Sequence, residues 1–205
     1  MISKEEAIAR TTATYNSAAD YFDAPPLSFW NRFGQKTIDR LSLRAGDRIL
    51  DVCCGTGASA IPAAKCVGST GTVLGIDLSE NLLDLARTKA QDLGLENIEF
   101  QMGDFENLGY KSESFDAIVC VFGIFFVPDM VAAVRELWRM VRPGGKLAIT
   151  SWGKNVFEPA NQVFWKAIET ERPDLYKHFT PWERISDPTS LKALLQAGKA
   201  TQVEV

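Results

Sequence analysis

The most informative stretch of the chain is Ile49-Leu50-Asp51-Val52-Cys53-Cys54-Gly55-Thr56-Gly57, where an apolar strand runs directly into a loop with two glycines. A helix is expected after this loop, with Pro62 in its early turns, where a missing backbone N–H costs least. Glycine allows positive φ and lets a ligand approach the backbone closely. The stretch therefore predicts a ligand site at the carboxyl edge of a sheet, although a tight turn without a ligand would carry the same two glycines.

Predicted strands and helices alternate from this stretch to about residue 152. Ser79 and Asp129 are expected to cap two of the helices, and the turn Pro143-Gly144-Gly145 is expected to end the last of them. Five strands that alternate with helices imply an α/β fold, a Rossmann-like, doubly wound and mostly parallel sheet with helices on both faces. The five predicted strands are Arg48–Cys53, Thr72–Asp77, Asn97–Met102, Phe115–Val121 and Lys146–Trp152.

The segments at the two ends of the chain have the sequence patterns of further helices and of a sixth strand. Ser3-Lys4-Glu5-Glu6 fits a capping box, so a short helix is expected there, and Ser28 can cap a second helix. Near the other end, Leu191–Gly198 has the pattern of a helix and Thr201–Val205 that of a strand. We therefore divide the chain into an N-terminal helical cap (1–44), a core (45–152), and a lid segment with a sixth strand (153–205).

Composition excludes several classes of function. The 205 residues carry 22 Lys+Arg against 26 Asp+Glu, a formal charge of −4, whereas a nucleic-acid binder usually has a basic surplus. No apolar run reaches the ~18–20 residues that a membrane-spanning helix needs, and the charged start MISKEEAIAR has no signal core. The four cysteines lack metal-ligand spacing, so we expect no metal site. We also expect no disulfide, because neighbouring strand residues such as Cys53 and Cys54 point to opposite faces and the chain has the features of a cytoplasmic protein, whose cysteines stay reduced.

A second signal for a ligand site lies twenty residues past Gly57, where the predicted strand Thr72–Asp77 ends in an acid. A carboxylate there faces the same crevice and can accept hydrogen bonds from both ribose hydroxyls of an adenosine, each worth roughly 1.5–3 kcal/mol. Asp77 could instead cap the next helix, but Ser79 already serves that role. Because Gly55-x-Gly57-x-x-Ala60 also fits the dinucleotide fingerprint, these signals leave two cofactor classes open.

Three features favour a sulfonium cofactor over a dinucleotide. Asp51 lies near the end of the first strand, where a pyrophosphate would meet a second negative charge but a cationic ligand would not. No tyrosine is followed four residues later by lysine, as in Tyr-x-x-x-Lys. Finally, Gly103-Asp104-Phe105 follows the third strand and places an acid and a flat ring where an adenine could be held.

The region from about Ala45 to Trp152 resembles class I S-adenosylmethionine-dependent methyltransferases, most closely the ubiquinone/menaquinone-biosynthesis C-methyltransferase-like group. Beside the first stretch, Gly75-Ile76-Asp77-Leu78-Ser79, Gly103-Asp104-Phe105 with Ser114-Phe115-Asp116, and Val141–Leu147 look like successive motifs of that family. Cys53 stands where many members have glycine, and Val121 where some relatives have a polar residue. The resemblance implies S-adenosyl-L-methionine as cofactor, in contact with Asp51, Cys53, Gly55, Thr56, Gly57, Asp77, Leu78, Asp104, Phe105 and Val121.

The family's sheet usually ends with an antiparallel strand beside the fifth, and this chain stops before it. Either the chain is truncated or the last hairpin is missing, which would leave an exposed sheet edge that a partner chain, such as a second copy in a homodimer, could cover. Neither an Asn-Pro-Pro-Tyr motif nor a Pro-Cys dipeptide follows the fourth strand, so the expected acceptor is a small, partly apolar or aromatic molecule and no nucleic acid.

The catalytic residue cannot be read from the sequence. Methyl transfer depends chiefly on orientation, and a general base matters only where the acceptor must lose a proton. Candidates for that base are Tyr15, Asp20, Tyr21 and the only histidine, His178. Methylation of carbon, oxygen or nitrogen stays open, as do two alternatives, an NAD(P)-dependent oxidoreductase and a non-catalytic cofactor-binding protein.

Overall fold

The structure is a computed structural model that describes residues 4–176 and 180–205. The chain separates into two compact units, one made of the residues up to Gly123 with Glu136–Thr150, and the other of Ile124–Arg135 with Ser151–Val205. The division into segments 1–44, 45–152 and 153–205 stays a prediction.

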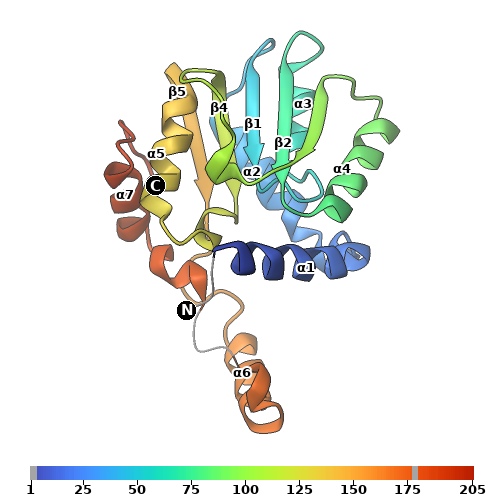
Figure 1. The fold of residues 1–205 in the computed structure, drawn as a ribbon, viewed down its shortest axis with the longest axis vertical. Helices are drawn as coiled ribbons and strands as arrows, with labels where there is room; N and C mark the ends of the chain where they lie inside the picture. The colour runs from blue at the N-terminus through green and yellow to red at the C-terminus, as the bar shows by residue number, and fades with distance from the viewer. Residues whose placement is uncertain (1–3, 177–179) are drawn as a thin grey trace. The chain divides into compact units, whose positions relative to one another are not determined.

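The first unit is built on a sheet of five parallel strands in the order β3-β2-β1-β4-β5 (Figure 1). Every pair of neighbouring strands is parallel, so all five carboxyl ends lie at one edge of the sheet. The predicted Rossmann-like α/β fold is therefore confirmed. The strands are β1 (Arg48–Val52), β2 (Thr72–Asp77), β3 (Ile98–Met102), β4 (Phe115–Val121) and β5 (Val141–Thr150).

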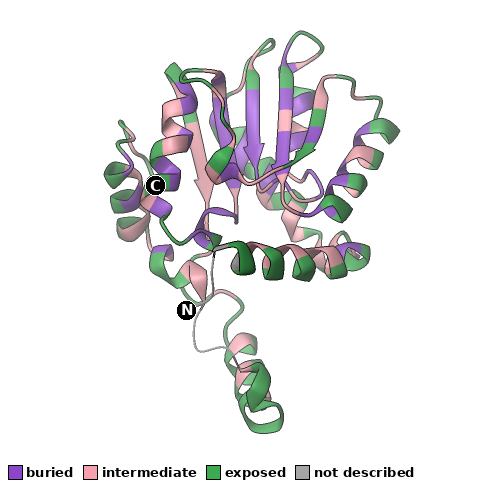
Figure 2. Ribbon diagram, viewed as in Figure 1, coloured by how far each residue is buried: buried purple, intermediate pink, exposed green. Residues whose placement is uncertain are grey.

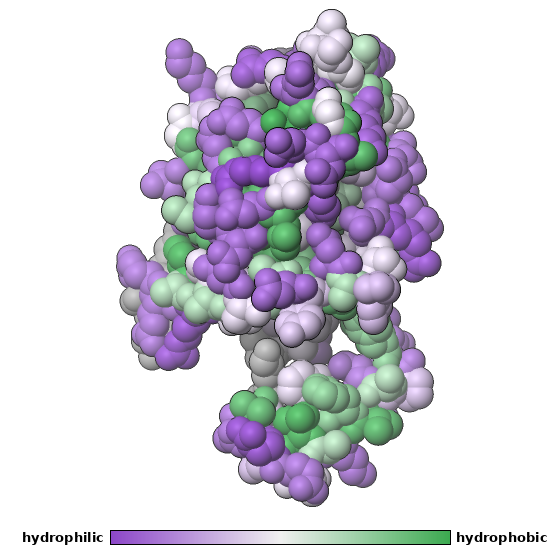
Figure 3. Space-filling view, turned by 90° about the vertical axis from the view of Figure 1, so that its right-hand side faces the viewer, coloured by the Kyte–Doolittle hydropathy of each residue, from purple (hydrophilic) through white to green (hydrophobic). Residues whose placement is uncertain are grey.

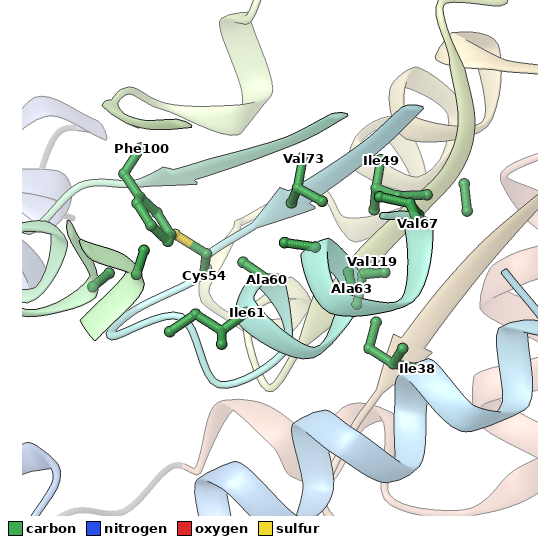
Figure 4. Close-up of a cluster of buried hydrophobic side chains, with 14 of the residues drawn as sticks. Ile38, Ile49, Cys54, Ala60, Ile61, Ala63, Val67, Val73, Phe100 and Val119 are labelled. Atoms are coloured by element: carbon green, nitrogen blue, oxygen red, sulfur yellow. The ribbon is translucent and has the colours of Figure 1, made fainter. Parts of the chain in front are cut away.

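The apolar strand β1 lies at the centre of the sheet, between β2 and β4. In β1 every residue after Arg48 is buried, and Figure 2 shows the middle strands as the most buried part of the sheet. Burial on both faces is what a parallel sheet covered by helices requires. Small residues in α3 (Ala60–Val67), among them Ala60, Ala63 and Ala64, let this helix approach the strands closely (Figure 4).

Helices cover the two faces of the sheet. The helices α2 (Phe29–Leu41), α3 and α4 (Glu80–Asp92) contribute to one buried apolar cluster with residues of β1, β2 and β4. In Figure 1, α2 and α3 lie behind the sheet, and the second half of α5 (Met130–Met140) lies in front of it. Ser79 caps α4 as predicted, since its Oγ accepts a hydrogen bond from the Leu82 N–H at 3.3 Å.

The N-terminal helix α1 (Lys4–Phe22) has 19 residues and is longer than the short helix expected from the sequence. It packs against α4 and crosses the carboxyl edge of the sheet (Figure 1). Ser28 does precede α2, but its side chain makes no cap hydrogen bond because its backbone is already helical. The expected capping box begins at Ser3, which lies outside the described residues.

The predicted turn before the fifth strand is wrong in its placement. Strand β5 begins at Val141, directly after α5, and the Pro143-Gly144-Gly145 turn forms an irregularity within it. Phe115 pairs with Val141 and Ala117 with Lys146, so extra residues of β5 must bulge out, and Gly144 accommodates this with φ 77°.

The second unit consists of short helices and connecting segments. They are the first half of α5 (up to Arg135), α6 (Ala160–Glu171), α7 (Pro188–Ala197), and the 3-10 turns η3 (Ile124–Phe126), η4 (Pro173–Leu175) and η5 (Pro181–Ile185). The predicted sixth strand at Thr201–Val205 is wrong, because these residues form no ladder and Gln202, with φ 54°, interrupts the extended backbone. Within the described ranges, no helix is both long and apolar enough to cross a membrane.

Candidate functional site

The glycine bend, residues Cys53 to Gly57, joins β1 to α3. Three of its residues have positive φ: Cys53 at 56°, Gly55 at 52° and Gly57 at 83°. The Cys54 N–H donates to the Ile76 carbonyl at 3.1 Å, which ties the bend to β2. The two glycines therefore adopt the left-handed backbone conformation that the sequence predicted for them.

Asp77 is the last residue of β2, and its side chain connects the glycine bend to the start of α4. Its Oδ2 accepts a hydrogen bond from the Gly55 N–H at 2.8 Å, and its Oδ1 accepts one from the Ser79 N–H at 2.9 Å. Burial raises the pKa of Asp77 above its ordinary value, and these hydrogen bonds act in the opposite direction. Asp77 thus holds the bend and the start of α4 in a fixed geometry.

Asp51 lies one strand away, buried near the end of β1. Its Oδ2 accepts a hydrogen bond from the Ser59 hydroxyl at 2.6 Å, while its buried Oδ1 accepts none. Burial is the main cause that raises the pKa of Asp51 to about 7; the hydrogen bond from Ser59 acts against it, and the charge of Asp77 acts with it. Two acids at one sheet edge therefore both bind protons more readily than usual.

The remaining predicted residues gather at the same edge. The Gly103 N–H donates to the Asp77 carbonyl at 2.9 Å, which brings the loop after β3 beside β2. Asp104 caps the turn η2 (Phe105–Asn107) through the Glu106 N–H at 3.0 Å, so its carboxylate already has a structural partner. Thr56 and Phe105 are buried, whereas Leu78 and Val121 are half-buried.

Helix α1 contributes polar groups that the sequence analysis missed. Asn16 Oδ1 accepts a hydrogen bond from the Ser79 hydroxyl at 2.6 Å. Just after the helix, Asp23 accepts one from the Thr56 hydroxyl at 2.8 Å and pairs with Lys89 at 2.9 Å. No local sequence signal could have indicated these contacts, because Asp23 lies beyond the end of α1 and its partners are far away in the sequence.

Aromatic rings from three elements lie beside the glycine bend. Phe22 stacks on Trp30 with 5.6 Å between centroids, and Trp30 meets Phe122 edge to face at 5.5 Å. Phe33 also contacts Phe122 at 5.5 Å, and a Cβ at Gly55 would lie 3.8 Å from the Phe22 ring. Aromatic residues before and after the glycine-rich region therefore converge on the bend.

The candidate bases differ in their surroundings. Tyr15 is largely buried near Cys53 and Asp77, and burial followed by these charges raises its pKa to about 12, so the phenol stays protonated at neutral pH. Asp20 and Tyr21 are exposed. His178 lies outside the described residues. Among the residues that the structure describes, no group of three or more His, Cys, Asp or Glu side chains could hold a metal ion.

The second unit has its own exposed apolar surface. Phe157, Val163, Phe164 and Leu175 are each at least half exposed, and the lowest part of Figure 3 shows green apolar patches among purple polar residues. Elsewhere in the unit, the Arg184 guanidinium donates to the Phe125 carbonyl at 3.1 Å.

The fold and the glycine bend define a Rossmann-like α/β domain with acids at the carboxyl edge of its sheet. The sequence profile of the ubiE/COQ5 methyltransferase family matches residues 10–174. The chain belongs to the ubiE/COQ5 methyltransferase family, which confirms the predicted resemblance.

Individual relatives agree with this assignment. The chain is 43% identical over 111 residues to a demethylmenaquinone methyltransferase of Oceanobacillus iheyensis, covering 54% of this chain and 47% of the relative. It is 32% identical over 171 residues to the ubiquinone/menaquinone biosynthesis C-methyltransferase UbiE of Haemophilus ducreyi, covering 80% and 65%. It is 33% identical over 142 residues to aklanonic acid methyltransferase DauC of a Streptomyces species, covering 69% and 64%. The chain thus spans about half to two thirds of the length of these relatives.

Solved structures share the fold. A SAM-dependent methyltransferase from Aquifex aeolicus superposes with a TM-score of 0.68 at 23% identity, covering 89% of this chain and 87% of that one. At this identity the likeness shows the Rossmann-like fold alone, so arguments about chemistry depend on the residues of the site.

Proposed function

We propose that this chain takes part in methyl transfer from S-adenosyl-L-methionine to a small, partly apolar or aromatic molecule. The observation that carries the proposal is the juxtaposition of the glycine bend with Asp77, in a chain of the ubiE/COQ5 methyltransferase family. The family assignment favours this reading over an NAD(P)-dependent oxidoreductase.

The electrostatics of the site fit a cationic cofactor. Asp51 keeps a buried carboxylate oxygen without a hydrogen-bond partner, and burial raises the pKa of both Asp51 and Asp77. A pyrophosphate would add negative charge beside them, whereas a sulfonium and an ammonium group would relieve the existing repulsion. The bound cofactor supplies an activated methyl group on a good leaving group.

In this proposal each side chain of the edge has a binding or positioning role. Asp77 would accept the ribose hydroxyls while it keeps its two backbone hydrogen bonds, since a carboxylate offers about four lone-pair sites. Asp51 would face the positive end of the cofactor. Phe105 and Asp104 would hold the adenine, and the remaining contacts would come from Cys53, Gly55, Thr56, Gly57, Leu78 and Val121.

We also propose the class of acceptor. Two of the relatives are named for menaquinone or ubiquinone biosynthesis, which favours carbon methylation of a reduced quinone ring. The rings of Phe22, Trp30 and Phe122 offer flat apolar surface beside the glycine bend, which suits an aromatic acceptor. With a protonated Tyr15 close by, the site could donate a hydrogen bond to the acceptor and orient it.

Two experiments test the proposal. Calorimetry should show binding of S-adenosylhomocysteine and not of NADH, and a preference for NADH would refute the cofactor assignment. Labelled methyl groups should then pass to a reduced demethylnaphthoquinone and not to a nucleic acid. Binding without any transfer would instead support the non-catalytic alternative. A homodimer and a cytoplasmic location remain predictions, the former testable by light scattering.

A further inference from the structure

Two cysteine thiols meet beside the glycine bend. A Cβ at Gly123 would lie 2.6 Å from the Cys53 sulfur and 3.1 Å from the Cys120 sulfur, so both sulfurs crowd the same point. The neighbouring Cys120 thiol is also the largest cause of the raised pKa of the Cys53 thiol. The two thiols are therefore direct neighbours, although 67 positions separate them in sequence.

The strand register explains how this contact arises. Val52 pairs with Cys120 across β1 and β4, so Cys53 lies one residue beyond the pair. A regular strand would point Cys53 to the opposite face from Cys120, but the left-handed φ of 56° at Cys53 breaks that alternation. With strands about 4.8 Å apart and a rise of about 3.3 Å, the two Cα atoms are roughly 6 Å apart, within the range that a disulfide spans.

We propose that Cys53 and Cys120 form an oxidation-sensitive dithiol, which a low-molecular-weight disulfide such as oxidised glutathione converts to an intramolecular disulfide. Cys53 is half-buried and Cys120 is fully buried, so Cys53 reacts first. Its thiolate attacks one glutathione sulfur, forming a mixed disulfide and releasing one glutathione, which takes up the proton that Cys53 lost. Cys120 then gives up its proton and displaces the second glutathione. The two cysteines are oxidised, and the oxidised glutathione is reduced to two thiols.

The reaction has a defined pH dependence. The Cys120 contact, and then burial, raise the pKa of the Cys53 thiol well above its ordinary value. The thiolate is the attacking species, so disulfide formation is slow at neutral pH and becomes faster as the pH rises. At neutral pH the two thiols therefore stay reduced during brief exposure to oxidised glutathione and form the disulfide only during prolonged exposure.

Oxidation would act on the site already described. Cys53 lies in the glycine bend, close enough to Asp77 and Tyr15 for their charges to affect one another. A disulfide would fix the bend to the end of β4 and change the position of a predicted cofactor contact. This regulatory consequence rests on the proposed function: cofactor binding would protect the dithiol, and the disulfide would weaken cofactor binding by the same factor, because such coupling is reciprocal.

The chemical step can be tested without any cofactor. The purified chain is incubated with oxidised glutathione at pH 8.5, alkylated, digested without reductant and analysed by mass spectrometry. We expect loss of two hydrogen atoms and a peptide that links Cys53 to Cys120. Cys53→Ser and Cys120→Ala should abolish the link, whereas Cys54→Ser at the adjacent position and Cys66→Ser at an exposed one should retain it.

Three results would overturn the proposal: a persistent glutathione adduct on Cys53, a link between Cys53 and Cys54, or unchanged thiols under conditions that oxidise free cysteine. Peptide mapping of the unaltered protein decides among them even if Cys120→Ala fails to fold. Repeating the reaction with S-adenosylhomocysteine tests the coupling, and we expect disulfide formation to slow at least tenfold. If the disulfide forms but neither redox state binds this ligand, the dithiol stands and the proposed function fails. Equal binding to both states would refute the coupling.

Discussion

Substitution of Asp77 is the most direct test of the site, because this carboxylate has both a structural and a proposed binding role. Asp77→Ala removes the acceptor of the Gly55 and Ser79 N–H groups. A buried N–H that loses its partner costs about 1–3 kcal/mol, so the loss of both partners should lower the free energy of unfolding by about 2–6 kcal/mol. The lost hydrogen bonds to a ribose would cost a further ~2–3 kcal/mol of binding, which weakens the dissociation constant about 30- to 140-fold.

Urea unfolding and titration calorimetry with S-adenosylhomocysteine separate these two effects. Calorimetry is performed at low temperature, where the variant is folded, as circular dichroism verifies. Asp77→Asn keeps the shape and one acceptor oxygen, so both losses should be smaller than for alanine. Asp84→Ala is the matched control, since it removes an acid of α4 that is mostly exposed and pairs with Arg87 at the surface. It should change stability by less than about 0.5 kcal/mol and leave binding unchanged.

Either half of this reasoning can fail separately. A folded Asp77→Ala variant that binds S-adenosylhomocysteine as tightly as the unaltered chain would refute the proposed ribose contact. Unchanged stability would refute the conclusion that Asp77 holds the glycine bend to the start of α4.

Three further predictions concern the surroundings of the bend. Gly34→Ala should destabilise the chain by about 1–3 kcal/mol in urea unfolding, because its Cβ would overlap the backbone of Ala58. The control Lys36→Ala, at an exposed position of the same helix, should leave the stability unchanged. Equal losses of stability in the two variants would contradict the packing argument. The pKa of Asp51 is raised to about 7 from an ordinary 3.8, so the folded state binds its proton more tightly. Stability from this group should be full below pH 3.8 and fall by up to about 1.4 kcal/mol per pH unit until pH 7, and Asp51→Asn should remove that slope. Asp23→Ala should lower stability by about 1 kcal/mol, since it loses its contacts to the bend and to α4; an unaltered unfolding midpoint would show that these contacts are not stabilising.

The strands were predictable where an apolar run has sharp ends. The predicted bounds Thr72–Asp77 and Phe115–Val121 coincide with β2 and β4. Both strands contain several β-branched residues between turn residues, and burial of both faces makes the apolar run nearly continuous. The start of β5 was not predictable from the same rules, because Pro143, Gly144 and Gly145 indicate a turn and only pairing with β4 retains them in the strand.

The candidate site was predictable only where it depends on local geometry. Gly55 and Gly57 were predictable because few other residue types adopt the left-handed backbone conformation that the bend needs. Asp77 was predictable because parallel strands bring their carboxyl ends together. The contacts of α1 were not, since Asp23 meets Thr56 across 33 positions and Lys89 across 66, and no local pattern encodes such pairs.

The same limit applies to the cysteines. From the sequence, adjacent strand residues point to opposite faces, which argued against any disulfide at Cys53 and Cys54. The left-handed backbone at Cys53 changes that reasoning, because it turns the Cys53 side chain toward Cys120 on the neighbouring strand.

The acids of the edge explain why electrostatics can choose between cofactors that the glycine pattern leaves open. Asp51 is buried and Asp77 is half-buried, burial raises the pKa of both, and the charge of Asp77 further disfavours ionisation of Asp51. A folded chain would lose this repulsion if either acid were replaced by an amide, so retaining two acids costs stability above pH 7. That cost is offset only when a positive group occupies the edge, and a dinucleotide offers none at its pyrophosphate. The same pair of side chains that destabilises the free chain thus supports a sulfonium ligand.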